Sequence, residues 1–111
     1  MQFDREFLTG NLTTLILALL GERPMYGYEM LQEAERRSDS QLRMKEGSLY
    51  PALHQMERGG LLVAEWREAP TGRSRKYYRL TARGRRAAAS KRRQWETMAA
   101  AMRTILGDAG A

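Results

Sequence analysis

The sequence predicts a mainly α-helical fold that carries one small β-hairpin, and two observations lead to this prediction. Apolar residues recur at helical spacing in four separate stretches of the chain. Between residues 61 and 80 the apolar period changes to two, on both sides of a turn. The 111 residues suit one compact domain, and no internal repeat or linker divides them.

Three helical patterns come first. Residues 8–20 place their apolar side chains on one face, and a glycine and a proline then end the helix. The second helix covers residues 26–34 and stops before the polar stretch 38–40. We expect the third helix over residues 47–58, where leucine and methionine form a buried stripe.

The sequence is consistent with two starting points for the third helix. Ser48 is a candidate N-cap, which would put Pro51 in the first turn, where proline is tolerated. If the helix starts earlier, Pro51 removes a hydrogen bond to the carbonyl of Gly47. Gly59 and Gly60 end the helix, because glycine adopts the left-handed conformation that a helix C-terminus needs.

A hairpin and a long helix complete the chain. Strands are expected over residues 62–67 and 75–80, joined by a turn at residues 69–72. Thr81 can cap the last helix. The apolar stripe of that helix contains Ala88, Trp95, Met98, Met102, Ile105 and Leu106.

This order of elements predicts a winged helix-turn-helix with a long C-terminal helix. Three helices followed directly by an antiparallel hairpin are typical of a winged helix-turn-helix DNA-binding domain, here over residues 1–81. Residues 82–111 would form a C-terminal dimerisation helix within the same structural unit, because their apolar stripe needs a partner.

The net charge of +6 is unevenly distributed along the chain. Residues 1–40 carry a net charge of −3, and residues 41–111 carry +9. A localised basic segment on a small domain points to a polyanionic partner, most often nucleic acid. Charge alone is equally consistent with a basic surface that only keeps the protein in solution.

The outer face of the third helix and the hairpin tip carry side chains suited to double-stranded DNA. Gln can bond the adenine edge, Arg can pair with guanine or phosphate, and Ser and Tyr hydroxyls can bind phosphate. Closely spaced cations at a tight turn can reach phosphates that a helix does not. The predicted DNA-binding residues are Ser48, Tyr50, Pro51, His54, Gln55 and Arg58 on the helix, and Arg73, Ser74, Arg75 and Lys76 on the hairpin. An ordinary solvated helix face is the alternative, and the basic hairpin that follows it favours DNA binding.

Other classes of function find no support in the residues. The chain has no cysteine and a single histidine, so we expect no metal site, no cofactor and no enzymatic activity. The N-terminus mixes charges unlike a signal peptide. The longest apolar stretch, residues 12–20, is shorter than the roughly 20 residues of a membrane span. We therefore expect a cytoplasmic protein without a membrane partner.

Four segments spread along nearly the whole chain form a recognisable set: residues 26–29, 46–57, 60–62 with Trp66, and 72–81 with Gly84. In this order they resemble the PadR family of transcriptional repressors. The resemblance implies a regulator of the short subgroup, which forms a homodimer through a single C-terminal helix assisted by the first helix. It also implies a repressor that releases DNA when a small, often aromatic, effector binds. A two-fold dimer would recognise an inverted-repeat operator.

The resemblance further suggests roles for single residues. Tyr50 would contact DNA or orient the recognition helix. The expected effector or dimer interface consists of Leu12, Ile16, Trp95, Met98, Met102 and Ile105. Two copies of Trp95 near the two-fold axis can pack as a solid core or leave a slot for a planar aromatic ligand, and both interpretations stay open. Lys91, Arg92 and Arg93 would lie close by and favour anionic compounds.

Two other classes of protein remain as alternatives. A winged helix used only for protein–protein assembly would not need the basic hairpin. A membrane-surface protein would use the basic stretch 83–93 as an amphipathic helix, although the apolar face there is mostly alanine.

Overall fold

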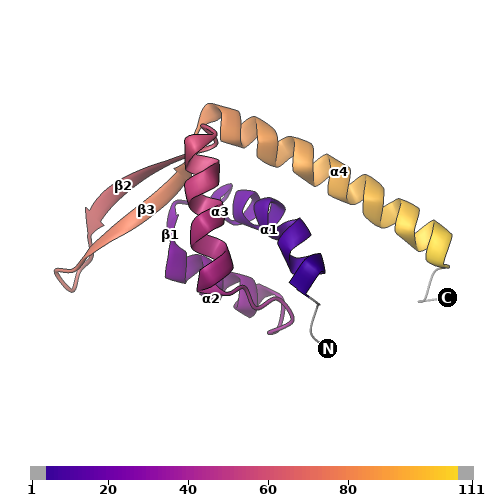
Figure 1. Cartoon of the computed structure of the whole chain (residues 1–111), viewed down its shortest axis with the longest axis horizontal. Helices are drawn as coiled ribbons and strands as arrows, with labels where there is room; N and C mark the ends of the chain where they lie inside the picture. Colours follow the sequence, from indigo (N-terminus) through magenta and orange to yellow (C-terminus); the bar gives the residue numbers. More distant parts are fainter. Residues whose placement is uncertain (1–4, 108–111) are drawn as a thin grey trace.

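Seven elements follow one another in the computed structural model of the chain, which describes residues 5–107 (Figure 1). They are α1 (Arg5–Leu20), β1 (Met25–Tyr26), α2 (Gly27–Arg37), α3 (Glu46–Arg58), β2 (Leu62–Glu68), β3 (Ser74–Leu80) and α4 (Ala82–Leu106). The predicted fold, a mainly α-helical winged helix-turn-helix with a long C-terminal helix, is confirmed. The outer ends of the two predicted regions, residues 1–4 and 108–111, lie outside the described residues.

The described strands form one antiparallel sheet in the order β1-β3-β2. Leu62 pairs with Leu80 at the base of the β2–β3 hairpin. Tyr26, which the sequence pattern assigns to the second helix, instead lies in β1 opposite Tyr77. The Tyr26 backbone is extended, so this residue is the N-cap of α2, which starts at Gly27. A strand of two residues is too short to show a period in the sequence, which explains why the pattern missed it.

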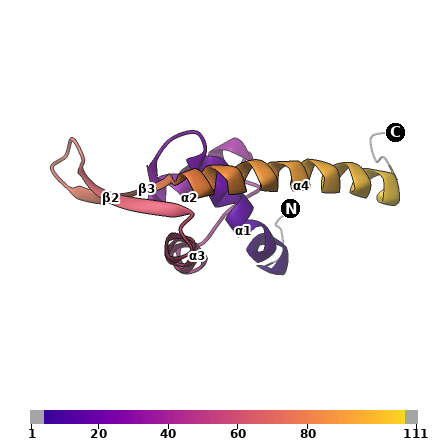
Figure 2. The same ribbon diagram turned by 90° about the horizontal axis from the view of Figure 1, so that it is seen from above.

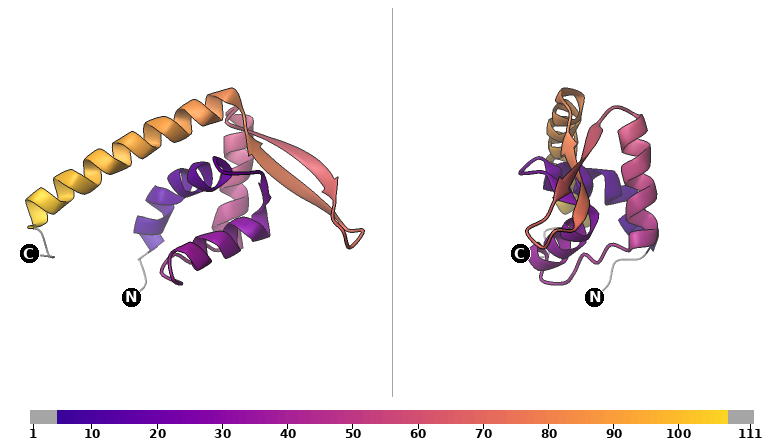
Figure 3. Two further views of the ribbon diagram at one scale, coloured as in Figure 1. Left: turned by 180° about the vertical axis from the view of Figure 1, so that it is seen from behind. Right: turned by 90° about the vertical axis from the view of Figure 1, so that its left-hand side faces the viewer.

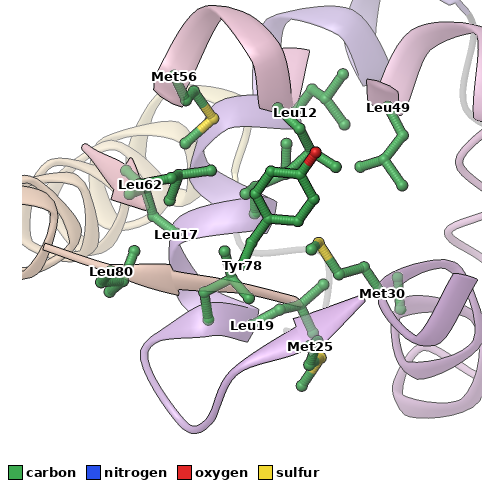
Figure 4. Close-up of a cluster of buried hydrophobic side chains, with 14 residues drawn as sticks. Leu12, Leu17, Leu19, Met25, Met30, Leu49, Met56, Leu62, Tyr78 and Leu80 are labelled. Carbon is green, nitrogen blue, oxygen red and sulfur yellow. The ribbon is translucent and has the colours of Figure 1, made fainter. Parts of the chain in front are cut away.

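The core lies where α1, α2, α3 and the base of the hairpin meet, around the ring of Tyr78 (Figure 4). Leu12 and Ile16 of α1 belong to this cluster and are only 8% and 0% exposed. The protomer's own core already encloses both side chains, which leaves them little surface for the effector or dimer interface at which they were expected. Burial of one such aliphatic side chain contributes about 1.5–3 kcal/mol to folding.

α3 begins before the candidate N-cap. The N–H groups of Ser48 and Leu49 already donate to the carbonyl of Lys45, at 3.0 and 2.9 Å, so Lys45 and not Ser48 is the N-cap. Pro51 consequently lies inside the helix, where it has no N–H to offer to the Gly47 carbonyl. Gly47 is exposed, and water can satisfy that carbonyl.

One small junction joins α3, the hairpin and α4. Gly60 has a φ of +79° and ends α3 in the left-handed conformation, as predicted. The Thr81 hydroxyl donates to the Gly60 carbonyl at 2.7 Å and accepts from the N–H of Gly84 at 3.0 Å, which confirms the predicted cap. A Cβ added at Gly84 would lie 2.1 Å from the carbonyl oxygen of Leu61. From this junction the hairpin and α4 project in opposite directions, along the 52 Å axis of the molecule (Figure 1).

Replacing Gly84 with alanine tests this junction. Gly84→Ala should destabilise the fold by about 3 kcal/mol or more, because the neighbouring atom is backbone and cannot rotate away. Gly10→Ala is the matched control, because a Cβ there meets nothing within 4 Å, and it should stabilise α1 by up to about 1 kcal/mol. Urea unfolding followed by circular dichroism measures both changes. Equal stability of the two variants would contradict the close approach.

Candidate nucleic-acid interface

α3 presents its predicted DNA-binding side chains on one exposed face. The exposed residues are Ser48, Tyr50, Pro51, His54, Gln55 and Arg58. Leu49, Leu53 and Met56 on the other side are buried in the core and hold the helix in place. The helix lies at the outside of the molecule beside the hairpin, as the view from above shows (Figure 2). Its polar face and the hairpin can therefore be reached by the same partner.

Tyr50 is held by α2. A Cβ at Gly27, the first residue of α2, would come within 2.6 to 2.7 Å of the Tyr50 ring and hydroxyl, so the ring lies directly against that bare backbone. Burial raises the pKa of the Tyr50 phenol, and Glu46 and Tyr78 raise it further. The phenol is therefore neutral at physiological pH. Of the two roles that the resemblance suggests, this contact supports orientation of the recognition helix.

The cations of the hairpin differ in what they contact. Arg73 is exposed at the tip and forms no ion pair with any residue of the described part of the chain. The guanidinium of Arg75 lies over the ring of Tyr26, 4.5 Å from its centroid. Lys76 Nζ lies 3.7 Å from Glu57 Oε1, which projects from α3. Arg73 can therefore meet a phosphate without giving up an internal contact.

A tight turn carries the tip. The N–H of Ala69 donates to the carbonyl of Arg73 at 2.8 Å, and the N–H of Gly72 donates back to Ala69 at 2.8 Å. Gly72 has a φ of +85°, which a residue with a Cβ rarely adopts. Ser74, which follows Arg73, is also exposed. The turn thus keeps Arg73 and Ser74, two of the predicted DNA-binding residues, exposed at the end of the hairpin.

Ion pairs within the N-terminal half of the chain neutralise several of its acidic side chains. Glu33 accepts hydrogen bonds from Arg36 and Arg37, which lower the pKa of its carboxyl to about 2. Arg37 also pairs with Glu22. The cations of α4, by contrast, form no ion pair among residues 5–107. The uncompensated positive charge therefore lies in the second half of the chain, on the hairpin and α4.

A groove of about 580 Å³ lies between α1 and the second half of α4. Trp95, Met98 and Met102 line it from α4, and Asn11 lines it from α1. Trp95 Nε1 donates a hydrogen bond to Asn11 Oδ1 at 3.0 Å, which ties the two helices together. The part of α4 that lines the groove lies away from the hairpin (Figure 1).

The surroundings of Trp95 differ from the expectation in one respect. Lys91 lines the groove as expected, but Arg92 lines a separate hollow near the end of α1, and Arg93 lines neither. The reason is that successive residues of a helix point about 100° apart. Beyond the groove the apolar stripe stays open, with Ile105 77% and Leu106 73% exposed.

Several contacts at these sites escaped the sequence patterns. Tyr26 supports Arg75, Glu57 holds Lys76, and Asn11 accepts the Trp95 N–H. Each contact joins residues far apart in the chain, so no local spacing indicates it. The contact of Tyr50 with Gly27 is different, because Gly27 lies in the Tyr-Gly-Tyr-Glu segment at residues 26–29, a segment already identified from the sequence.

Residues 5–107 contain neither a group of side chains suited to a metal ion nor a helix suited to cross a membrane. No three His, Asp or Glu side chains in this span are grouped so that they could hold a metal ion. None of the helices in it combines the length and the apolar character needed to cross a membrane.

Comparisons with known proteins agree with this architecture. Residues 16–90 match the Transcriptional regulator PadR-like family. A transcriptional regulator from Mycobacterium tuberculosis is 38% identical over 103 residues, which cover 93% of this chain and 90% of that protein. A crystal structure of a PadR-like transcriptional regulator from Bacillus cereus superposes with a TM-score of 0.81 at 25% identity, covering 92% of this chain and 97% of that one.

A PadR family transcription regulator from Clostridium difficile superposes with a TM-score of 0.75 at 33% identity, covering 88% of this chain and 100% of that one. The matched residues include α2, α3 and the whole hairpin. The family match and the superpositions cover the elements that carry the candidate interface, so this chain belongs to the PadR-like family of transcriptional regulators.

Proposed function

We propose that the chain is a homodimeric repressor that binds an inverted-repeat operator in double-stranded DNA and releases it when a planar aromatic compound binds. The observation that carries DNA binding is that the exposed polar face of α3 lies beside a hairpin whose tip cation, Arg73, is unpaired among the described residues. In the winged-helix mode the recognition helix enters the major groove, and the hairpin reaches the flanking backbone or minor groove.

The homodimer rests on the apolar stripe of α4. Met98, Met102, Ile105 and Leu106 are between 42% and 77% exposed on one face of this helix. Such a patch calls for a partner, and a second copy offers the same patch about a two-fold axis. Pairing of this kind would place two recognition helices roughly 34 Å apart, one turn of DNA, and so demands an inverted repeat.

The effector site rests on the groove beside Trp95. The indole gives a flat apolar wall, and Met98 and Met102 give flexible, polarisable walls that tolerate varied ligands. Lys91 at the edge suits planar compounds with an anionic group. A ligand bound there would alter the packing of α1 against α4. This would change the position of the two copies of α3 relative to each other. Packing of Trp95 as plain dimer core is the competing interpretation.

The contacts of α4 and the hairpin support neither of the two alternative classes, the membrane-surface protein and the module for protein assembly. Ala87 and Ala88 pack against the core, so the basic stretch of α4 has little apolar surface left for a membrane. A module for protein assembly alone would not need the exposed cation of Arg73.

The two parts of the interface should respond differently to substitution. Arg73→Ala should weaken binding to all duplexes by a similar factor and lower the slope of log affinity against log salt by about one. Gln55→Ala should change the preferred sequence, with about tenfold loss at one base position, and leave the salt slope nearly unchanged. Arg103→Ala, which removes an exposed cation from the last turn of α4, is the control and should change neither. Fluorescence anisotropy with a selected and a random duplex measures these effects, and equal affinity of the unaltered protein for both would contradict sequence selectivity.

The dimer should depend on the α4 stripe. Met98→Lys should shift the protein from dimer to monomer at micromolar concentration, because it buries a charge without a partner in an apolar interface. Thr97→Lys adds the same charge on another side of α4, where the chain is also exposed, and should leave the dimer intact. Sedimentation velocity distinguishes the two species. A monomeric unaltered protein would rule out the proposed assembly.

The groove should bind planar aromatic compounds. In Trp66→Phe, which keeps Trp95 as the single tryptophan of the chain, a panel of such compounds should quench the emission. Trp95→Phe, which keeps Trp66, is the control and should not respond. An effective compound should also lower affinity for the selected duplex by about 5- to 150-fold, the range of typical allosteric coupling. Absence of quenching, or quenching without a change in DNA affinity, would leave Trp95 as dimer core only.

A further inference from the structure

The indole of Trp66 is exposed in a position that neither the core nor the α4 stripe explains. It is 69% exposed, more than Trp95 at 46%. Its N–H donates to none of the described residues. Its neighbours along β2, Glu65 and Arg67, pair with each other on the opposite face of the strand. Trp66 therefore offers a flat apolar surface and a free donor to a partner from outside the protomer.

The register of the hairpin determines which way Trp66 faces. Trp66 lies opposite Lys76 in the antiparallel pair, and both share a face of the sheet with Tyr78, which points into the core. Lys76 on that face reaches Glu57 of α3 at 3.7 Å. Trp66 thus lies on the side of the hairpin that faces α3, and α3 stands beside the hairpin on one side of it (Figure 3, right).

We propose that Trp66 is a duplex contact, packing its ring against the sugar-phosphate backbone in the angle between α3 and the hairpin. This inference rests on the proposed DNA binding. Trp66 is four residues from Leu62 at the hairpin base, about 13 Å along the strand. It therefore lies between the two surfaces expected to meet DNA, the outer face of α3 and the tip at Arg73.

The chemistry of the backbone fits this residue. Deoxyribose offers apolar faces to the ring, and a phosphate oxygen can accept the N–H of Trp66. Stacking on bases is excluded in an intact duplex, because its bases are already stacked. Of the acids on this side of the hairpin, Glu57 of α3 is paired with Lys76, and Glu68 shares the Trp66 face. A backbone contact carries no sequence information, so it adds affinity and not selectivity.

A matched pair of single-tryptophan proteins tests the contact directly. Trp95→Phe reports on Trp66, and Trp66→Phe reports on Trp95. Acrylamide quenching is measured for each variant with and without a duplex selected from random DNA, while anisotropy of the labelled duplex confirms saturation. The duplex should reduce the quenching constant of Trp66 by about half or more and leave that of Trp95 unchanged.

Affinity supplies the second readout. Trp66→Ala should weaken the selected and the random duplex by the same factor, about tenfold. Trp66→Phe keeps a flat ring but loses the donor, so its loss should be smaller. The exposed indole contributes little to the core, and unchanged urea unfolding of Trp66→Ala will separate lost contact from lost fold.

Each contrary outcome is distinct. A duplex that binds while the quenching of Trp66 stays the same overturns this inference and leaves the proposed DNA binding intact. Protection of Trp66 that rises with protein concentration in the absence of DNA would assign the indole to a contact between copies, and this too overturns the inference. Failure of the unaltered protein to bind any duplex would overturn both proposals together.

Discussion

The close approach of the Leu61 carbonyl to the bare backbone of Gly84 is the constraint on which the rest of the structure depends. Leu61 leads into β2 and Gly84 lies in the first turn of α4, so this contact joins the hairpin to the long helix. Thr81 reinforces it with hydrogen bonds to the carbonyls of Gly60 and Leu61. Gly60 also ends α3. This helix, the hairpin and α4 therefore all leave from a single junction, and the direction of each is set by the other two.

From that junction α4 projects as one long helix. Its 25 residues extend about 37 Å from the base of the hairpin. Along its length α4 touches the protomer through α1, and the hydrogen bond from Trp95 to Asn11 is one of these ties. Ile16, one and a half turns further along α1, is packed in the core with Leu49 of α3. Packed side chains therefore connect the surroundings of Trp95 with α3, and the proposed effector response would need such a connection.

The charge of the chain is organised by tertiary contacts as well as by position. Each acidic side chain of α2 is paired with an arginine: Glu33 with Arg36 and Arg37 of the same helix, Glu29 with Arg23 before it, and Glu35 with Arg43 after it. Within the hairpin, Arg75 stacks on Tyr26 and Lys76 is held by Glu57, so both also brace the hairpin against the rest of the domain. Cations that look equivalent in the sequence thus divide into those that position the hairpin and those that remain open to a phosphate.

The sequence by itself determined the order of the four helices and the hairpin, the polar outer face of α3 and the basic character of the hairpin, because helical and strand periods involve neighbouring residues. It also determined that Thr81 caps α4, a signal confined to four residues. Only the tertiary structure decided that Tyr26 forms a strand, that α3 starts at Glu46, and that Ile16 faces inward. The strand needs a partner from β3, and the direction of a side chain on α1 depends on which elements enclose it. Such outcomes arise from contacts between distant segments, and no local pattern contains them.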